Sequence, residues 1–238
     1  MCKFATENID ASATSPAEIY EAIKEHLPSS PLVKKSYDYV SSRLLNTALL
    51  NHSLRTYLYA ARVSTLSPVK PLSPNYLTLA FIAAIFHDFG LCEDGDGPDR
   101  FEICGANAAV QFLREHAPEF TEAEVLDVWT SMALHSSPGL PLHYSELTRA
   151  MRVAVTVDFD MPGIREEFGF LPDYVEQVEK VLPMLNAFEV LKDVVLKQIL
   201  KRHGKARARK APSPSWPFDV LREALEKEGS YEGADVHL

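Results

Sequence analysis

Apolar residues recur at intervals of three and four along most of the chain, the spacing that places them on one face of an α-helix. After Pro16, for example, Ile19, Ile23 and Leu27 share a face, and Pro28 ends the run. On this basis helices are predicted over residues 16–27, 32–45, 46–63, 74–88, 102–116, 121–135, 145–158, 171–203 and 216–228. The predicted helix over 171–203 is one long element with a proline kink.

Capping residues mark where several of these helices begin. Ser15 stands directly before a proline, and Thr121 is followed three residues later by Glu124. Both arrangements are typical of a helix start, the second as a capping box. Ser73, which also precedes a proline, is predicted to cap the helix that ends at His87 and Asp88.

The stretch Val153–Val157 is the one β-like run in the chain, but no partner strand accompanies it. It is therefore assigned to a buried helix. The pattern predicts an all-α fold in a single domain over residues 1–238, made of roughly nine helices. Its core would cover about 30–200, with a C-terminal helical extension over 201–238.

Composition and charge narrow the class of protein. The chain has 238 residues, of which 46% are hydrophobic and 24% charged, as in ordinary globular proteins. A net charge of −9 argues against a nucleic-acid partner, whose binding surface should be basic. The one basic cluster, residues 201–210, is interpreted as a solvated helix end or a mobile segment.

Neither a membrane nor a secretory role is predicted. No apolar run approaches the roughly 20 residues that a membrane span needs, and the first residues lack the apolar core of a signal peptide. Cys2, Cys92 and Cys104 form no paired framework, which favours a reducing, cytoplasmic setting.

Four histidine and aspartate side chains stand where burial is costly, at about 2–7 kcal/mol for an unpartnered neutral polar group. His52 lies inside an apolar helix, His87 and Asp88 end the next one, and Asp158 ends the valine-rich helix. Two imidazoles and two carboxylates meeting inside a bundle would suit Zn, Fe or Mn. Taken alone, each residue has an ordinary alternative: His52 as a hydrogen-bonded core histidine, Asp158 as a cap on the following turn.

Five segments considered together are more specific than any one of them. They are Leu50–Arg55, His87–Leu91, Arg100–Ala109, Ala133–Ser137 and Asp158. In this order they resemble the HD-domain superfamily of metal-dependent hydrolases, and within it the fungal cyanamide hydratases. The resemblance covers about residues 49–163.

The resemblance implies an HD-domain helical bundle that holds one divalent metal, with Zn²⁺ expected ahead of Fe²⁺ or Mn²⁺. The implied ligands are His52, His87, Asp88 and Asp158. His135 is implied as a catalytic residue; Thr156, Glu102 and Phe101 are implied as substrate-binding.

Two of these assignments have alternatives in the sequence itself. Thr156 would equally well be a helix-interior hydroxyl bonded to its own backbone. His135 would otherwise face water at a helix C-terminus. HD-type di-iron oxygenases carry a histidine where this chain has Phe101, so a single metal is expected and an oxygenase is disfavoured.

The expected function is a metal-dependent lyase, a hydratase that adds water to a small nitrile and converts cyanamide to urea. Phe86, Phe89 and Phe101 would line its pocket. The alternative is a phosphohydrolase of nucleotide monophosphates or related phosphate esters, with Arg55, Arg62 or Arg100 at the phosphate. The third possibility is a degenerate, non-enzymatic fold that binds partners.

A small molecule is the expected partner, with no nucleic acid or membrane, and homo-oligomerisation stays open.

Overall fold

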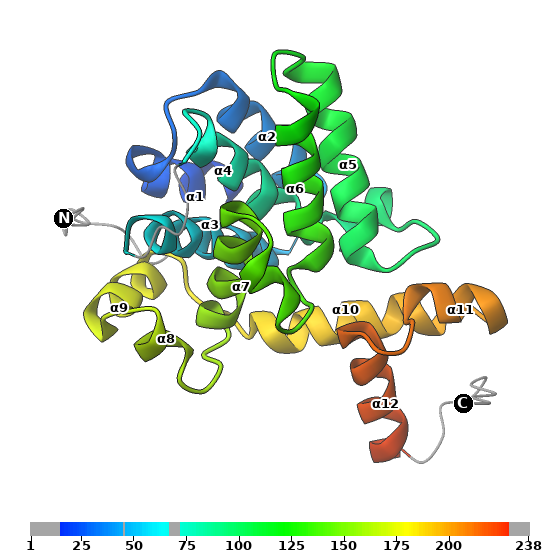
Figure 1. The fold of residues 1–238 in the computed structure, drawn as a ribbon. Helices are drawn as coiled ribbons and strands as arrows, with labels where there is room; N and C mark the ends of the chain where they lie inside the picture. Colours follow the sequence, from blue (N-terminus) through cyan, green and yellow to red (C-terminus); the bar gives the residue numbers. More distant parts are fainter. Residues whose placement is uncertain (1–14, 45, 67–71, 229–238) are drawn as a thin grey trace.

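The computed structural model describes residues 15–44, 46–66 and 72–228, and in these ranges it contains helices and no strand (Figure 1). The predicted all-α fold class is confirmed. The α-helices are α1 (Pro16–Ile23), α2 (Pro31–Ser41), α3 (Thr47–Leu66), α4 (Tyr76–Phe86), α5 (Phe101–His116), α6 (Glu122–Leu134), α7 (Glu146–Asp158), α8 (Ile164–Glu167), α9 (Pro172–Val181), α10 (Ala187–Leu200), α11 (Gly204–Lys210) and α12 (Trp216–Glu228). Short 3₁₀ helices are η1 (Lys24–His26), η2 (Phe89–Leu91), η3 (Glu93–Gly95) and η4 (Leu140–His143).

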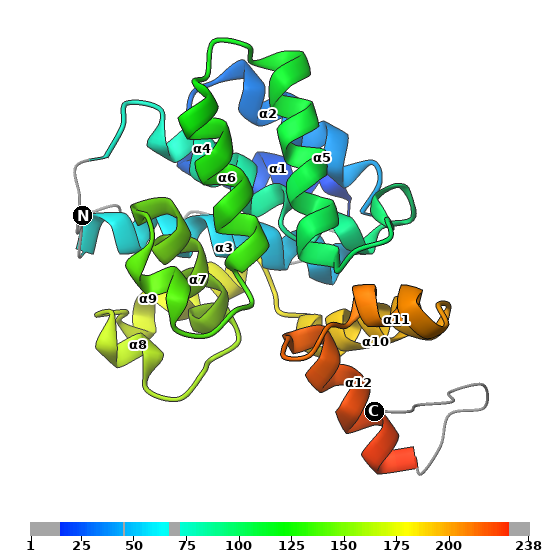
Figure 2. The ribbon, with the colours of Figure 1, turned by 45° about the vertical axis from the view of Figure 1, so that its right-hand side comes forward.

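The long helix α3 lies at the centre of the bundle and packs most extensively against α7 and α4, with α9 and α10 also in contact (Figures 1 and 2). Most of its side chains are buried, including the polar His52 and Arg55, at 1% and 0% exposure. A helix enclosed on all sides cannot send polar groups to solvent. These two side chains must therefore find partners inside the protein.

Helix α4 is apolar all round, and its residues from Ala80 to Phe86 are at most 1% exposed. It begins at Tyr76, with Asn75 as an N-cap that makes no side-chain hydrogen bond. The predicted cap at Ser73 is wrong by two residues, because the carbonyl of Ser73 instead accepts the Tyr76 amide in a turn at 3.0 Å. The C-terminal end of α4 delivers His87 and Asp88 to the interior.

The predicted N-cap at Ser15 of α1 and the predicted capping box of Thr121 and Glu124 on α6 are both confirmed, and Ser15 also forms a capping box, with Glu18. The side-chain oxygen of each cap accepts the amide three residues on, and the glutamate accepts the cap's own amide.

The single helix predicted over 171–203 is wrong. The chain forms α9 and α10 there, separated by a break that contains Pro183. Proline excludes a continuous helix, and Leu185 and Asn186 follow it with positive φ angles of 48° and 59°. This division, with the short α8 and α11, raises the number of α-helices in the described ranges from the predicted nine to twelve.

Helices α10, α11 and α12 form a C-terminal arm (residues 187–228) that extends away from α3 and then turns (Figures 1 and 2). The basic cluster over 201–210 belongs to this arm. Its interpretation as a solvated or mobile segment is wrong for Lys210, which is 2% exposed with its ammonium 2.5 Å from Asp96. Arg202 approaches the same carboxylate at 3.1 Å. In the described part of the chain, no helix has the length and apolar character to cross a membrane.

Candidate metal centre

Three of the predicted ligands, His52 from α3 with His87 and Asp88 after α4, meet in one buried cluster. The two Nε2 atoms lie 3.0 Å apart. Asp88 Oδ2 is 3.3 Å from Nε2 of His87 and 3.6 Å from Nε2 of His52. All three side chains are at most 1% exposed. One ligand atom from each lies within 4.8 Å of the others, so the group could hold a metal ion.

The outer ring nitrogens fix the tautomers of both histidines. Nδ1 of His87 is 2.7 Å from the carbonyl oxygen of Ala84, and Nδ1 of His52 is 2.6 Å from a carboxylate oxygen of Asp158. Because carbonyl and carboxylate oxygens accept hydrogen bonds, each Nδ1 carries the hydrogen and each Nε2 turns a lone pair to the cluster. Metal-binding histidines commonly make this outer contact.

The lone pairs of the two Nε2 atoms and of Asp88 Oδ2 therefore face one another with no hydrogen between them, which is repulsive. Asp88 Oδ2 has no hydrogen-bond partner, and burial lowers the pKa of His87, which opposes a proton there. A hydrogen bond between the two Nε2 atoms would need a buried imidazolium. A divalent cation removes this repulsion, and mixed imidazole and carboxylate donors suit Zn, Fe or Mn.

The fourth predicted ligand, Asp158, lies on the other side of His52. Its carboxylate accepts from His52 Nδ1 and from Arg55, whose Nε and Nη2 lie at 2.6 and 2.9 Å. Burial acts to raise the pKa of Asp158, but the Arg55 charge and the His52 hydrogen bond outweigh it and lower the pKa. In this arrangement Asp158 orients His52 as an ionised carboxylate, and its role as a metal ligand stays a prediction.

Two glycines let α5 approach the turn that carries the cluster. A Cβ on Gly90 would stand 2.1 Å from the carbonyl oxygen of Phe101. A Cβ on Gly105 would stand 2.8 Å from the carbonyl oxygen of Phe86 and 3.1 Å from that of His87. Only glycine permits these approaches, which bring the start of α5 against the cluster.

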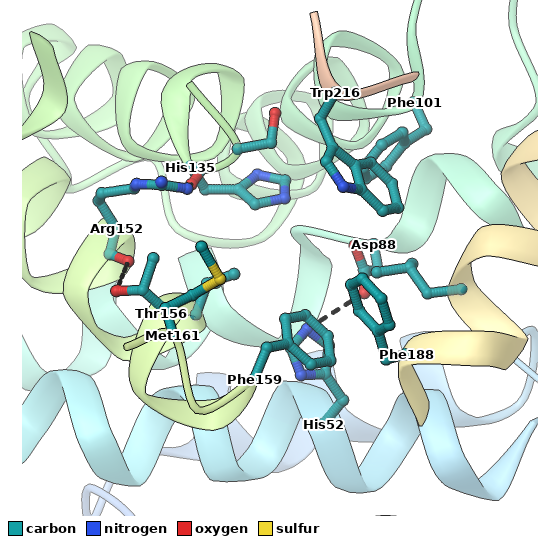
Figure 3. A pocket seen from close by; sticks show the side chains of 13 residues that line it. His52, Asp88, Phe101, His135, Arg152, Thr156, Phe159, Met161, Phe188 and Trp216 are labelled. Carbon is teal, nitrogen blue, oxygen red and sulfur yellow. Dashed lines mark hydrogen bonds and ion pairs between the residues drawn. The ribbon is translucent and has the colours of Figure 1, made fainter. Parts of the chain in front are cut away.

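The cluster opens into a cavity of about 280 Å³ (Figure 3). Its lining comes from the bundle and from the C-terminal arm: His52, Asp88, Phe101, His135, Ser136, Arg152, Val155, Thr156, Phe159, Met161, Phe188, Leu191 and Trp216. Phe159 stacks on His52 with ring centroids 4.6 Å apart. Most of the wall surface is therefore aromatic or aliphatic.

His135, the predicted catalytic residue, lies at the end of α6 and lines this cavity. Its Nδ1 is 2.6 Å from the carbonyl oxygen of Met132, so Nδ1 carries the hydrogen and Nε2 has the lone pair. Burial, and then the neighbouring His87, lower the pKa of His135 well below 6.5. His135 is therefore a neutral imidazole here, with its ring centroid 4.9 Å from that of His87.

The predicted substrate-binding residues divide into two groups. Phe101 and Thr156 line the cavity, whereas Glu102 does not. The Thr156 hydroxyl donates to backbone carbonyl oxygens of its own helix, as the alternative interpretation predicts, and its role in substrate binding stays a prediction. Glu102 is fully buried and forms an ion pair with Arg100 at 2.5 Å. It also accepts a hydrogen bond at 2.5 Å from the hydroxyl of Ser136, a residue that lines the cavity.

The prediction that Phe86 and Phe89 line the pocket is wrong. Their rings lie 5.5 Å apart in a core aromatic group with Tyr39 and Phe112. Phe86 ends α4 and Phe89 begins η2, and both side chains are buried in the core.

Sequence reasoning missed Arg152, Phe188 and Trp216 as cavity residues. Arg152 carries a usable signal, because it stands one helical turn before Thr156 on α7. Phe188 and Trp216 carry none, because only the folded arm brings them to the cavity.

No known family model matches the chain, and no curated protein matches it either. The site is therefore interpreted from its own geometry.

Proposed function

We propose that the chain is an HD-type, metal-dependent hydratase, a lyase that adds water to the carbon of a small nitrile and converts cyanamide to urea. One observation carries the proposal: donor atoms of His52, His87 and Asp88 converge in one buried cluster, and two members of this cluster, His52 and Asp88, line a small, largely apolar cavity. The ordered motifs that resemble cyanamide hydratases support it.

The donor set fits one divalent ion, Zn²⁺ first and Fe²⁺ or Mn²⁺ second. Three protein ligands with a position left open are typical of catalytic zinc sites. When bound, such an ion would lower the pKa of water towards about 7 and polarise the nitrile nitrogen. Asp158 would hold His52 in the required tautomer.

His135 would move the proton. As a neutral imidazole with a free lone pair on Nε2, it can take a proton from the attacking water and then give it to the nitrile nitrogen, which gains electrons as the C–O bond forms. Thr156 Oγ1 donates its hydrogen to its own helix, so it offers a substrate N–H group only lone pairs. Phe101 and Phe159 would exclude bulk water.

A phosphohydrolase is the second candidate, and one observation favours it: Arg152 lines the cavity. The arginines expected at a phosphate do not. Arg55 is paired with Asp158, and Arg100 with Glu102. The hydratase is favoured because the resemblance to cyanamide hydratases extends over five ordered segments, whereas Arg152 is the one arginine among the described residues that line the cavity.

Elemental analysis combined with product assays tests the proposal. The purified protein should contain about one metal per chain, release urea from cyanamide, and release no phosphate from nucleotide monophosphates. His87→Ala should lose the metal and reduce urea release at least about 100-fold, since it removes a ligand. His143→Ala, an exposed histidine on η4, is the matched control and should keep both.

A metal-free protein with full urea release would refute the metal's role. Phosphate release without urea release would replace the hydratase with the phosphohydrolase.

A further inference from the structure

Arg152 brings a positive charge to the cavity that no carboxylate in the described part of the chain balances. It is the one cationic residue among the lining side chains. Its Nη1 donates to the backbone carbonyl oxygen of His135 at 3.1 Å, and no carboxylate of residues 15–44, 46–66 or 72–228 forms an ion pair with it. Burial lowers its pKa, with no carboxylate opposing the shift.

Two buried arginines, by contrast, form ion pairs with carboxylates. Arg149, on the same helix, pairs with Glu146 at 2.6 Å, and Arg55 is held by Asp158 at 2.6 Å. A partly buried charge without a partner costs free energy. A ligand that supplies the missing negative charge would recover it.

The cavity is also larger than cyanamide requires. Small-molecule sites of roughly 300–1,000 Å³ hold drug-sized ligands, and this cavity has about 280 Å³ whereas cyanamide has only three non-hydrogen atoms. Aromatic rings line one side without a break: Phe159 to Phe188 at 5.1 Å, Phe188 to Trp216 at 6.4 Å, and Trp216 to Phe101 at 6.1 Å between centroids. This surface suits an apolar or planar ligand body.

We propose that the substrate of this cavity carries a carboxylate that binds the guanidinium of Arg152, with its body against the aromatic rings and its reacting group at His52 and Asp88. Figure 3 shows Arg152 entering from α7, on the opposite side of the cavity from Asp88 and Phe188. Only the identity of the reacting group, a nitrile, rests on the proposed hydratase function; cyanamide would then be a minimal nitrile that the site accepts, and the preferred substrate a larger nitrile with a carboxylate. A carboxylate matches the single charge and the forked donors of one arginine.

Calorimetric titration with benzoate and benzamide tests this proposal. The two probes have similar shape and differ in charge, and neither contains a C≡N group, so binding is measurable whether or not the chain is a hydratase. The wild type should bind benzoate at least about tenfold more tightly than benzamide, because a hydrogen bond between two charged groups is stronger than one to a neutral amide.

Arg152→Gln should abolish this preference while leaving benzamide affinity unchanged, which also shows that the variant's cavity is intact. Arg62→Gln is the matched control, since that half-buried guanidinium lies 5.3 Å from the Tyr174 ring and does not line the cavity. It should keep the benzoate preference.

Equal affinities for the two probes in the wild type would overturn the proposal. So would benzoate binding that Arg152→Gln leaves unchanged, because the carboxylate would then be bound elsewhere, for instance at the metal. Methyl phosphate binding more tightly than benzoate, and lost in Arg152→Gln, would replace the carboxylate with a phosphate. None of these outcomes depends on urea release from cyanamide.

Discussion

At the scale of single residues, the geometry of the His52, His87 and Asp88 cluster depends on which histidine nitrogen already makes a hydrogen bond outside it. Asp158 accepts a hydrogen bond from Nδ1 of His52, and the carbonyl oxygen of Ala84 accepts one from Nδ1 of His87. The Nε2 atom of each histidine therefore keeps its lone pair and faces Asp88. Arg55 in turn keeps Asp158 ionised. The geometry of the metal centre therefore depends on an arginine that cannot itself bind a metal.

Arg55→Met should lower the free energy of unfolding by about 3–5 kcal/mol, because it leaves the Asp158 carboxylate buried without its cation. Urea denaturation followed by circular dichroism measures this. Arg62→Met, about two turns along the same helix and half-buried, is the control and should change stability by about 1 kcal/mol or less. Equal losses in the two variants would contradict this account of Arg55.

The sequence identifies His52, His87 and Asp88 because polar residues stand out in apolar helices. The sequence does not show whether Asp158 faces Nε2 or Nδ1 of His52. In the structure the Asp158 carboxylate is held by Arg55 on the Nδ1 side. Arg152 escapes notice for a related reason: an arginine on a helix is ordinary until the folded chain shows that no carboxylate faces it.

At the scale of elements, the C-terminal arm is fastened to the loop that follows the metal centre. Lys210 and Arg202 share Asp96, and Arg209 contacts Asp99 at 2.7 Å. Helical periodicity predicts most helices of the fold, but it carries no information on pairing between segments about a hundred residues apart. The basic cluster therefore looked solvated in the sequence, although it holds the arm that supplies Phe188 and Trp216 to the cavity.

Asp96→Asn should loosen this arm, because it leaves the buried ammonium of Lys210 facing a neutral amide. Amide hydrogen exchange in α11 and α12 should become at least about tenfold faster, which corresponds to about 1.4 kcal/mol of lost local stability. Asp99→Asn is the control, since its partner Arg209 has a 58% exposed side chain, and exchange should stay within about twofold. Unchanged exchange in both variants would show that the ion pairs do not hold the arm.

At the scale of the whole molecule, the cluster that could hold a metal joins α3 to the end of α4, so metal binding, if it occurs there as proposed, should be linked to global stability. An ion present at 100 times its dissociation constant adds about 2.7 kcal/mol to the folded state. For a chain of this size that corresponds to a rise in Tm of roughly 5–10 °C.

Zn²⁺ added to metal-depleted protein should therefore raise Tm in differential scanning fluorimetry. Mg²⁺ should not, because it prefers an oxygen octahedron to imidazole donors. His87→Ala should abolish the zinc response. A rise with Mg²⁺ equal to that with Zn²⁺, or one that persists in His87→Ala, would place the binding ion elsewhere.

The position of Trp216 gives the protein a built-in optical reporter. The chain contains two tryptophans, and Trp129 bonds Asn107 between α5 and α6, outside the set of cavity residues. Replacing Trp129 with phenylalanine leaves a single indole whose emission comes from the cavity wall. Ligand entry and displacement of the arm can then be followed in real time without an attached dye.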